Sequence, residues 1–407
     1  MTITAQPFKK LPVGISDFKE IITQNYAFVD KSLFIREVVE EGTYVCAITR
    51  PRGFGKTVNM SMLENFLCHH VKEDLFTGLL IKNHPEFCAK YQNKRPVIFL
   101  SFKNVKHENF QGAMECMAEI FSQLYKKHED VLEGDFLWSE SKKDFMRILD
   151  KNIDNPYRLE RALTNLMRYL KKRYEKSVVV LIDQCDTPLE QGRLNGYESE
   201  IGSFMSRLFE SALKDNSDLS QGILTGVTWT CQSGIFSGFN NVCVSDILDS
   251  DYSSCFGFTE EEVISLLPEN LQIEPMRQWY GGYEIGGIHL YNPFSVIHCL
   301  DNHGILDNYW IQSSDNHFIL KFLENPESYR KEALETLIAK TPKEHTVDRD
   351  GRGWTGCIHR GYAKLTGTSR GYWAELLGNL EVPNTEIMGL YEEIYKNIPR
   401  KKTKAST

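Results

Sequence analysis

The sequence predicts an α/β fold in which a mainly parallel sheet is flanked by helices. The first supporting observation is that short apolar runs, which do not alternate with polar residues, are followed by segments of helical periodicity. Buried parallel strands joined by crossover helices give this pattern. The second observation is that one apolar run leads into Gly-Lys-Thr and another ends in an aspartate. Both features are typical of strand ends that bind phosphate.

Four apolar runs in the first half are predicted as strands. They are short, rich in Val, Ile and Leu, and lie at residues 44–49, 96–101, 177–183 and 222–227. Between them, apolar residues recur every three or four positions, which predicts amphipathic helices with one face in the core. These helical stripes run from Val58 to Leu67, from Phe110 to Leu124, from Leu159 to Leu170 and from Ile201 to Leu213.

The pattern changes in the second half of the chain. Thr259 and Glu262 have the spacing of a capping box, which predicts a short helix. The Gly-rich segment 280–291 predicts a hairpin, and Asn292 followed by Pro293 predicts the start of another helix.

The remaining segments complete the expected domain organisation. Residues 341–372 are polar and Gly-rich, so we expect loops and short strands there, before a final helix at 384–398. We therefore expect a nucleotide-binding domain at residues 1–257 and a smaller, mainly helical α+β region at 258–399, with a lid-like or winged-helix-like form. A basic tail follows at 400–407.

Composition excludes several classes of protein. Of the 407 residues, 41% are hydrophobic and 25% are charged, which is the balance of an ordinary folded protein. The net charge of −8 argues against a protein that coats nucleic acid. No apolar run approaches the roughly 20 residues that span a bilayer, and the N-terminal segment lacks the apolar core of a secretory signal. We expect a cytoplasmic protein, although composition does not distinguish this from delivery to another compartment.

The cysteines favour thiols over disulfides or a metal site. None of the ten cysteines forms a Cys-x-x-Cys pair. Cys68, His69 and His70, followed by His84 and Cys88, resemble zinc ligands, but the gap between the two groups is not a standard zinc spacing. We therefore expect no zinc site here.

The most informative motif joins the strand at 44–49 to the helix that begins near Lys56. This strand–loop–helix segment with Gly-Lys-Thr is the context of a P-loop, whose backbone N–H groups surround phosphate. Arg50 occupies the position of the first glycine in GxxxxGK[ST], and with Arg52 and Lys56 it forms a local cluster of cations. The alternative is a strand-to-helix turn with no ligand. The residues expected to bind the nucleotide are Arg52, Gly53, Phe54, Gly55, Lys56, Thr57 and Val58.

A second motif supplies the metal and water chemistry. The strand at 177–183 ends in Asp183, as a Walker B strand does, so Thr57 and Asp183 are the expected Mg²⁺ ligands. Gln184 follows, and its neutral amide can orient water but cannot accept its proton. Asp186 could compensate as a base. We favour the alternative that Asp186, before Thr187-Pro188, caps a helix.

Taken together, these segments resemble the AAA-ATPase-like family of bacterial and archaeal proteins, over nearly the whole chain. The resemblance implies a P-loop NTPase fold of the ASCE/AAA-like type, with ATP and Mg²⁺ as ligands, and it makes Arg50 a family variation. The matching segments are 11–18, 26–35, 49–57, 97–103, 181–189, 225–227, 235–238, 240–241, 256–259, 279–283, 291–296 and 382–387.

The chain also departs from the family pattern. Relatives usually have Arg at the position of Gly53, Glu at Gln184, and Arg and Lys near Trp229 and Gln232. At three of these positions, Gln184, Trp229 and Gln232, a polar or charged group around the expected γ-phosphate is thus replaced. Many relatives continue into a nuclease-like domain of the PD-(D/E)xK type. No such carboxylate-and-lysine cluster is evident here, so we do not expect nuclease activity.

Three functions remain open from the sequence. The first is a Mg-ATP-binding protein with slow hydrolysis, whose bound state acts as a conformational signal. The second is a nucleotide-independent scaffold with a degenerate loop. The third is an efficient ATPase that uses Asp186 or a residue of a neighbouring subunit as the base. The sequence identifies no protein partner, and a homo-oligomer is compatible with it.

Overall fold

The computed structural model describes residues 9–153, 155–229, 241–313, 316–324, 334–340, 344–347, 353–370 and 376–397. The chain forms two compact units. The first comprises Met1–Arg50 and Gly55–Phe256, and the second comprises Pro51–Phe54 and Gly257–Thr407. The short loop Pro51–Phe54 thus belongs to the second unit, although it connects two elements of the first.

The first unit is built on a five-stranded sheet in which every pair of neighbouring strands is parallel. The strands are β1 (Val45–Thr49), β2 (Val97–Ser101), β3 (Val178–Asp183), β4 (Leu219–Gly226) and β5 (Cys243–Ser245), in the order β2-β3-β4-β1-β5. The first four confirm the predicted strands. The sequence did not predict β5, because three residues are too few to show a periodic pattern. Since β4 lies between β1 and β3, the strand before the loop and the strand that ends in Asp183 are not neighbours.

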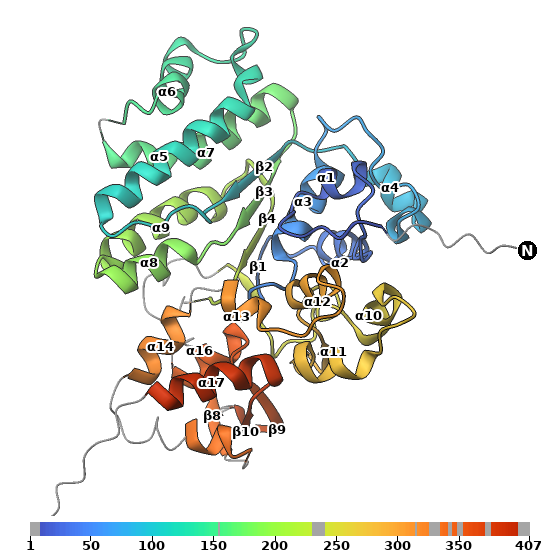
Figure 1. Cartoon of the computed structure of the whole chain (residues 1–407). Coiled ribbons are helices and arrows are strands. Elements are labelled where there is room, and N and C mark those ends of the chain that lie inside the picture. Colours follow the sequence, from blue (N-terminus) through green and yellow to red (C-terminus); the bar gives the residue numbers. More distant parts are fainter. Residues whose placement is uncertain are drawn as a thin grey trace, which may run out of the picture. The chain divides into compact units, whose positions relative to one another are not determined.

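Helices cover both faces of this sheet. In Figure 1, α1–α3 lie on one face and α5, α7, α8 and α9 on the other. The predicted helical stripes correspond to α3, α5, α7 and α9. The helices of the first unit are α1 (Phe18–Thr23), α2 (Leu33–Glu40), α3 (Lys56–Leu67), α4 (Pro85–Tyr91), α5 (Phe110–Lys127), α6 (Ser139–Leu149), α7 (Pro156–Tyr174), α8 (Thr187–Asn195) and α9 (Glu198–Leu213), with two 3₁₀ turns at Leu80–Asn83 and Glu129–Leu132.

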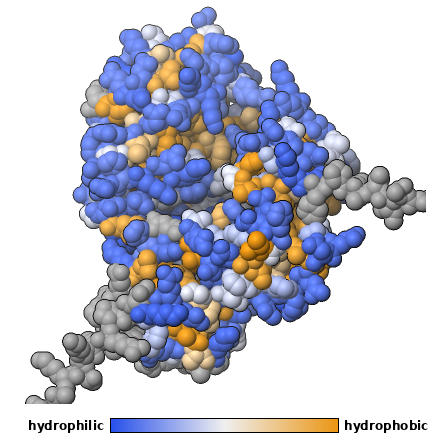
Figure 2. Space-filling model, viewed as in Figure 1, coloured by the Kyte–Doolittle hydropathy of each residue, from blue (hydrophilic) through white to orange (hydrophobic). Residues whose placement is uncertain are grey.

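The core of the first unit lies between the sheet and the helices α5, α7 and α9. Ile98, Phe121, Leu163 and Phe204 are all fully buried there, and they come from one strand and three different helices. The outer faces of these helices are largely hydrophilic in Figure 2. Burial of one apolar face of each helix therefore fixes the sheet whose carboxyl edge is described below.

The second unit contains a two-stranded hairpin and a three-stranded antiparallel sheet, β8-β10-β9, with helices. Residues 334–338 are also helical. The other elements are α10 (Glu260–Leu266), α11 (Ile273–Tyr280), β6 (Tyr283–Ile285), β7 (Ile288–Leu290), α12 (Pro293–Asp301), α13 (Tyr309–Ser313), α14 (His317–Glu324), β8 (Glu344–Val347), α16 (Gly353–Arg360), β9 (Lys364–Arg370), β10 (Leu376–Glu381) and α17 (Thr385–Asn397).

Most of the local predictions for this unit are confirmed. Both hydrogen bonds of the capping box between Thr259 and Glu262 are present, β6 and β7 form the predicted hairpin, and Asn292 caps α12. The prediction of loops and strands at 341–372 is wrong in part, because α16 is helical. Glycines dilute its pattern, but its Trp354, Cys357 and Ile358 are buried, so tertiary packing stabilises this helix.

Candidate functional site

The carboxyl ends of four strands meet at one edge of the first unit's sheet. Thr49 of β1 is paired with Gly226 of β4, and Ser101 of β2 is paired with Asp183 of β3. In an open parallel sheet this edge is where ligands bind, because loops leave the strands there and helix N-termini face it. The sequence-predicted residues Lys56, Thr57 and Asp183 all belong to it.

Asp183 is the centre of a hydrogen-bond network at this edge. It is fully buried. Its Oδ2 atom accepts hydrogen bonds from Thr57 Oγ1 at 2.9 Å and from Ser101 Oγ at 3.3 Å, and its Oδ1 atom accepts one from Thr225 Oγ1 at 2.8 Å. The prediction that Thr57 and Asp183 lie together is thus consistent with this geometry. Ser101 and Thr225 were not predicted, although a hydroxyl near the end of each neighbouring strand was visible in the sequence.

The loop before α3 places a cation and several backbone donors beside this carboxylate. Gly55 has φ of +80° and is the N-cap of α3, a conformation that favours glycine. Lys56 is buried, and its Nζ atom donates a hydrogen bond to the carbonyl of Arg50 at 2.8 Å. The first N–H groups of a twelve-residue helix and a lysine therefore lie at the same loop.

Arg50 does not contribute to the cation cluster that the sequence suggested. Its guanidinium is fully buried, and it donates to the carbonyls of Thr49, Ser245, Asp246 and Asp251 at 2.7–3.0 Å. Burial lowers the pKa of Arg50 to about 10. The physical cause is that carbonyl oxygens within the protein accept hydrogen bonds from both terminal nitrogens of this guanidinium. Arg50 joins the end of β1 to the segment after β5.

Gln184 occupies a backbone conformation that few non-glycine residues adopt, with φ of +53°. The chain turns there, and the next residue, Cys185, donates its N–H to the carbonyl of Thr225 at 2.9 Å. The Gln184 side chain is half-buried, and its Oε1 atom accepts a hydrogen bond from Thr187 Oγ1 at 3.5 Å. The amide thus stands at the start of α8, directly after Asp183.

Asp186 has a different role from the helix cap that we favoured. It is the residue before α8, but its side chain makes no capping hydrogen bond. Its Oδ2 atom instead accepts the N–H groups of Val227 at 2.8 Å and Thr228 at 2.9 Å. A Cβ on Gly226 would lie 2.9 Å from Oδ1, so the carboxylate is held closely against the chain after β4.

The environment of Asp186 shifts the pKa of its carboxyl group upward. Burial raises the pKa of this carboxyl group, and the charge of Glu190 raises it further. The two backbone N–H groups and Lys56 act in the opposite direction. Because both N–H groups bind its Oδ2 atom, Asp186 fixes the backbone after β4, and its Oδ1 atom takes part in neither bond.

The other predicted binding residues line the same loop. Arg52, Gly53, Thr57 and Val58 are half-buried, and Phe54 is buried. Of the family departures, Trp229 is half-buried and packs against the core of the first unit, while Gln232 lies outside the described residues. Any contact that Gln232 makes with the loop thus stays untested.

The comparisons with known proteins place this geometry in a family. Residues 12–236 match the family described as predicted AAA-ATPase, which covers more than half of the chain and includes both motifs. The chain belongs to this AAA-ATPase family. A relative from Azotobacter chroococcum mcd 1, described as a protein in the 5′ region of vnfD, is 27% identical over 337 residues. That alignment covers 81% of this chain and 59% of the relative, so the chain spans less than two thirds of its length.

The family match and the sheet together confirm the predicted fold class. The sheet is parallel and flanked by helices, and β4 separates the loop-bearing strand from the Asp183 strand. This is a P-loop NTPase-like fold of the kind that the family name implies. No helix in the described part of the chain is long and apolar enough to cross a membrane.

The donor set at Asp183 fits Mg²⁺ better than a transition metal. Thr57 and Asp183 offer hydroxyl and carboxylate oxygens 2.9 Å apart, and Mg²⁺ prefers oxygen ligands while retaining several waters. Among the described residues, no group of three or more His, Cys, Asp and Glu is placed to hold a metal ion. At the motif considered for zinc, His69 Nδ1 lies 2.9 Å from the carbonyl of Arg95, and Cys88 Sγ donates to the carbonyl of Ile81.

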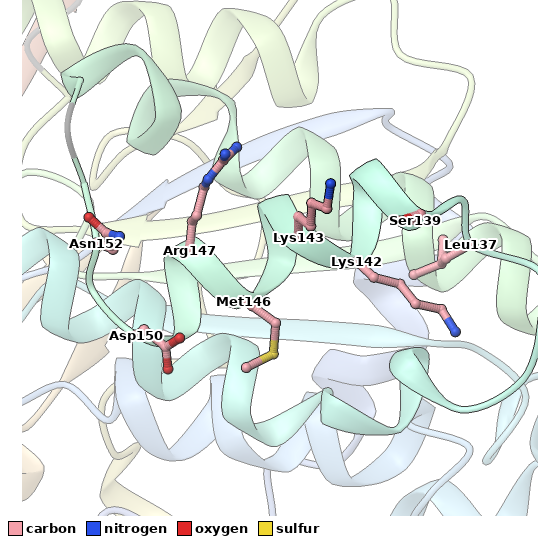
Figure 3. A pocket seen from close by; sticks show the side chains of 8 residues that line it. All are labelled: Leu137, Ser139, Lys142, Lys143, Met146, Arg147, Asp150 and Asn152. Atoms are coloured by element: carbon pink, nitrogen blue, oxygen red, sulfur yellow. The ribbon is translucent and has the colours of Figure 1, made fainter.

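A pocket of about 660 Å³ along α6 is separate from this edge. None of its lining residues belongs to the loop or to a strand end, and Figure 3 shows Lys143 and Arg147 projecting from α6 on a different side from Met146. Lys143 pairs with Glu140 and Arg147 with Asp144. Acidic neighbours on the same helix thus pair with two of the three cations that line this pocket.

Proposed function

We propose that this AAA-ATPase family member binds Mg-ATP at the loop Arg52–Val58 and hydrolyses it slowly, so that the bound nucleotide acts as a conformational signal. The observation that carries this proposal is the hydrogen bond between Thr57 Oγ1 and Asp183 Oδ2 at 2.9 Å. It brings the two expected oxygen ligands of Mg²⁺ together beside Lys56.

The residues around this bond have separable tasks. Lys56 would neutralise the β- and γ-phosphates, while the N–H groups of Gly53, Phe54, Gly55 and Val58 would donate to phosphate oxygens. Thr57 and Asp183 would hold Mg²⁺, and bound Mg²⁺ would neutralise phosphate charge. Ser101 and Thr225 keep the Asp183 carboxylate oriented, because they donate to it from the neighbouring strands.

Slow hydrolysis follows from the residue after Asp183. A glutamate there would accept the proton of the attacking water, whereas the Gln184 amide can only orient that water. Loss of general-base assistance lowers a rate by about 10²–10⁴. The catalytic set proposed here is Asp183, Gln184 and Asp186, with Asp186 supporting the backbone after β4.

Calorimetry with Mg-ATP tests this proposal directly. We expect the purified protein to bind Mg-ATP, and a Lys56→Ala variant to bind it much more weakly because the phosphate charge is no longer offset. Omission of Mg²⁺ should weaken binding as well. Absence of Mg-ATP binding to the unmodified protein would reject the proposal.

The scaffold alternative has one observation in its favour. The Lys56 ammonium already donates to the carbonyl of Arg50 at 2.8 Å, as it would in a turn with a purely structural role. If ATP changes the thermal stability of neither the unmodified protein nor Lys56→Ala, the scaffold is favoured.

The efficient-ATPase alternative receives less support. Two N–H groups occupy one oxygen of Asp186, so this carboxylate is committed to the backbone. A turnover assay at several protein concentrations separates a base from a neighbouring subunit, because specific activity would then rise with concentration. We also propose a homo-oligomer and a cytoplasmic location for this protein. Residues 258–399 would have a lid-like or winged-helix-like role.

A further inference from the structure

The loop Pro51–Phe54 packs into the second unit through Pro51, Gly53 and Phe54. It lies between β1 and α3 of the first unit, yet its contacts are those of the second. The phosphate loop is therefore not an independent turn of the sheet edge.

Phe54 is the main apolar contact of this loop. Its side chain is 1% exposed, and its ring lies edge-to-face against the ring of Tyr283 in β6, with centroids 5.1 Å apart. The carbonyl of Phe54 accepts the N–H of Gly257 at 3.2 Å. A Cβ on Gly257 would lie 3.0 Å from the Phe54 ring and 3.2 Å from Leu290, so the ring fills the space above this glycine.

The neighbouring loop residues are equally confined. A Cβ on Gly53 would lie only 2.6 Å from Asn292 Oδ1 and 3.0 Å from Phe294, at the start of α12. Gly53 also has φ of +81°, which favours glycine. On the other side of the loop, Pro51 lies 3.1 Å from where a Cβ of Gly361 would be.

These contacts fix the backbone that must bind phosphate. The N–H groups of the loop can converge on an anion only in one backbone conformation. Since Phe54 stands two residues before Lys56, any rearrangement of the loop would move the Phe54 ring against Tyr283, Leu290 and Gly257.

We propose that Phe54 is a positioning residue that holds the phosphate loop in its binding conformation and transmits the nucleotide state to the hairpin β6–β7 and to α12. This inference rests on the proposed function, because it requires Mg-ATP to bind the loop. The ligand is a nucleoside triphosphate, and the responding segment is 257–294 of the second unit.

The experiment combines affinity with amide hydrogen exchange in the full chain. We expect Phe54→Ala to weaken Mg-ATP binding about tenfold, as when only about a tenth of the loops occupy the binding conformation. The Mg-ATP affinity of Phe54→Leu should lie between those of the unmodified protein and Phe54→Ala, because leucine retains part of the apolar contact. In the unmodified protein, saturating Mg-ATP should slow amide exchange in 257–294, and in Phe54→Ala this change should disappear.

Phe145→Leu is the matched control. Phe145 is also a fully buried phenylalanine in an aromatic contact, with Tyr125 in the first unit, but it lies in α6. This variant should keep both the affinity and the exchange response. If Phe54→Ala does not fold, Phe54→Leu carries the same test against Phe145→Leu.

The outcomes separate the two proposals. If Mg-ATP binds but does not change amide exchange in 257–294, the proposed role of Phe54 is rejected and the proposed function stays in place. The same conclusion follows if the Phe54 variants keep both the affinity and the exchange response of the unmodified protein. No Mg-ATP binding to the unmodified protein would reject both.

Discussion

Two buried carboxylates, one in each unit, have the same exposure and different surroundings. Asp183 and Glu386 are both fully buried. Asp183 accepts hydrogen bonds from the hydroxyl groups of Thr57, Ser101 and Thr225, at the edge of the sheet where Lys56 lies. Glu386 accepts hydrogen bonds from the hydroxyl of Ser295 at 2.8 Å and from the N–H of Trp310 at 2.7 Å.

The difference indicates what each carboxylate can do. Burial raises the pKa of Glu386 to about 7, although hydrogen bonds from Ser295, Trp310 and Ile311 act in the opposite direction. Glu386 therefore suits internal packing in a protonated form. At the sheet edge, flexible hydroxyl donors and a nearby lysine suit a carboxylate that exchanges partners when a charged ligand binds. The same residue class thus serves structure in one unit and, in the function that we propose, ligand chemistry in the other.

The largest expected effect is a faster ATP hydrolysis after a substitution at the sheet edge of the first unit. Gln184→Glu would place a carboxylate directly after Asp183, where it can accept a proton from water. We expect the ATP turnover number to rise by about 10²–10⁴. A phosphate-release assay measures this change, with Gln191→Glu in α8 as a control that should not raise turnover. An unchanged rate would show that the missing base is not the cause of slow hydrolysis.

The next effect concerns the cation of the same edge. Lys56→Ala removes the charge that we propose faces phosphate, and we expect Mg-ATP affinity to fall by about 10–10², as for loss of one hydrogen bond to a charged group. Calorimetry gives the affinity. Lys82→Ala, which removes a partly exposed lysine in a surface pair with Asp74, is the control and should bind normally. Equal affinities would contradict the assignment of the phosphate site.

The buried carboxyl group of Glu386 in the second unit should make the free energy of unfolding depend on pH. The folded pKa of Glu386 is raised to about 7 from 4.5, so the folded state retains this proton between those values. Its contribution to stability is therefore complete below pH 4.5 and is lost as the pH rises through 7. The loss amounts to about 3 kcal/mol.

Urea unfolding of the unmodified protein and Glu386→Gln at pH 5 and pH 8 measures this effect. We expect the free energy of unfolding of the variant to change less between the two pH values, because glutamine does not ionise. Asp186 also has a raised pKa but is present in both proteins, so the difference between them reports Glu386. Parallel pH profiles would contradict the prediction.

The smallest expected effect is the loss of stability when one hydroxyl group is removed in each unit. Thr225→Val removes a donor to Asp183, and Ser295→Ala removes a donor to Glu386. We expect a loss of about 1.5–3 kcal/mol of unfolding free energy for Thr225→Val, because it breaks the network of three hydroxyls around Asp183, and about 1 kcal/mol for the single hydrogen bond that Ser295→Ala removes at pH 6. Chemical unfolding of both variants at pH 6 tests the order, and the reverse order would refute the comparison.

Local sequence patterns predicted much of the fold and part of the site. The runs at 44–49 and 177–183 predicted β1 and β3 because fully buried parallel strands have no polar alternation. Lys56, Thr57 and Asp183 were predicted as site residues because each stands at a fixed offset from a strand end. The hydroxyls of Ser101 and Thr225 were not found, since their relation to Asp183 depends on strand order.

The sequence by itself determined the α/β class, the strand–loop–helix with Gly-Lys-Thr, the aspartate strand, and the capping box and hairpin of the second unit. Each of these depends on contacts within a few residues. Only the tertiary structure decided that β4 lies between β1 and β3, that Arg50 is enclosed by carbonyls, that Asp186 binds the backbone after β4, and that Phe54 packs in the second unit. The physical reason is that these features join residues far apart in the chain, and burial selects among partners that a local pattern cannot distinguish.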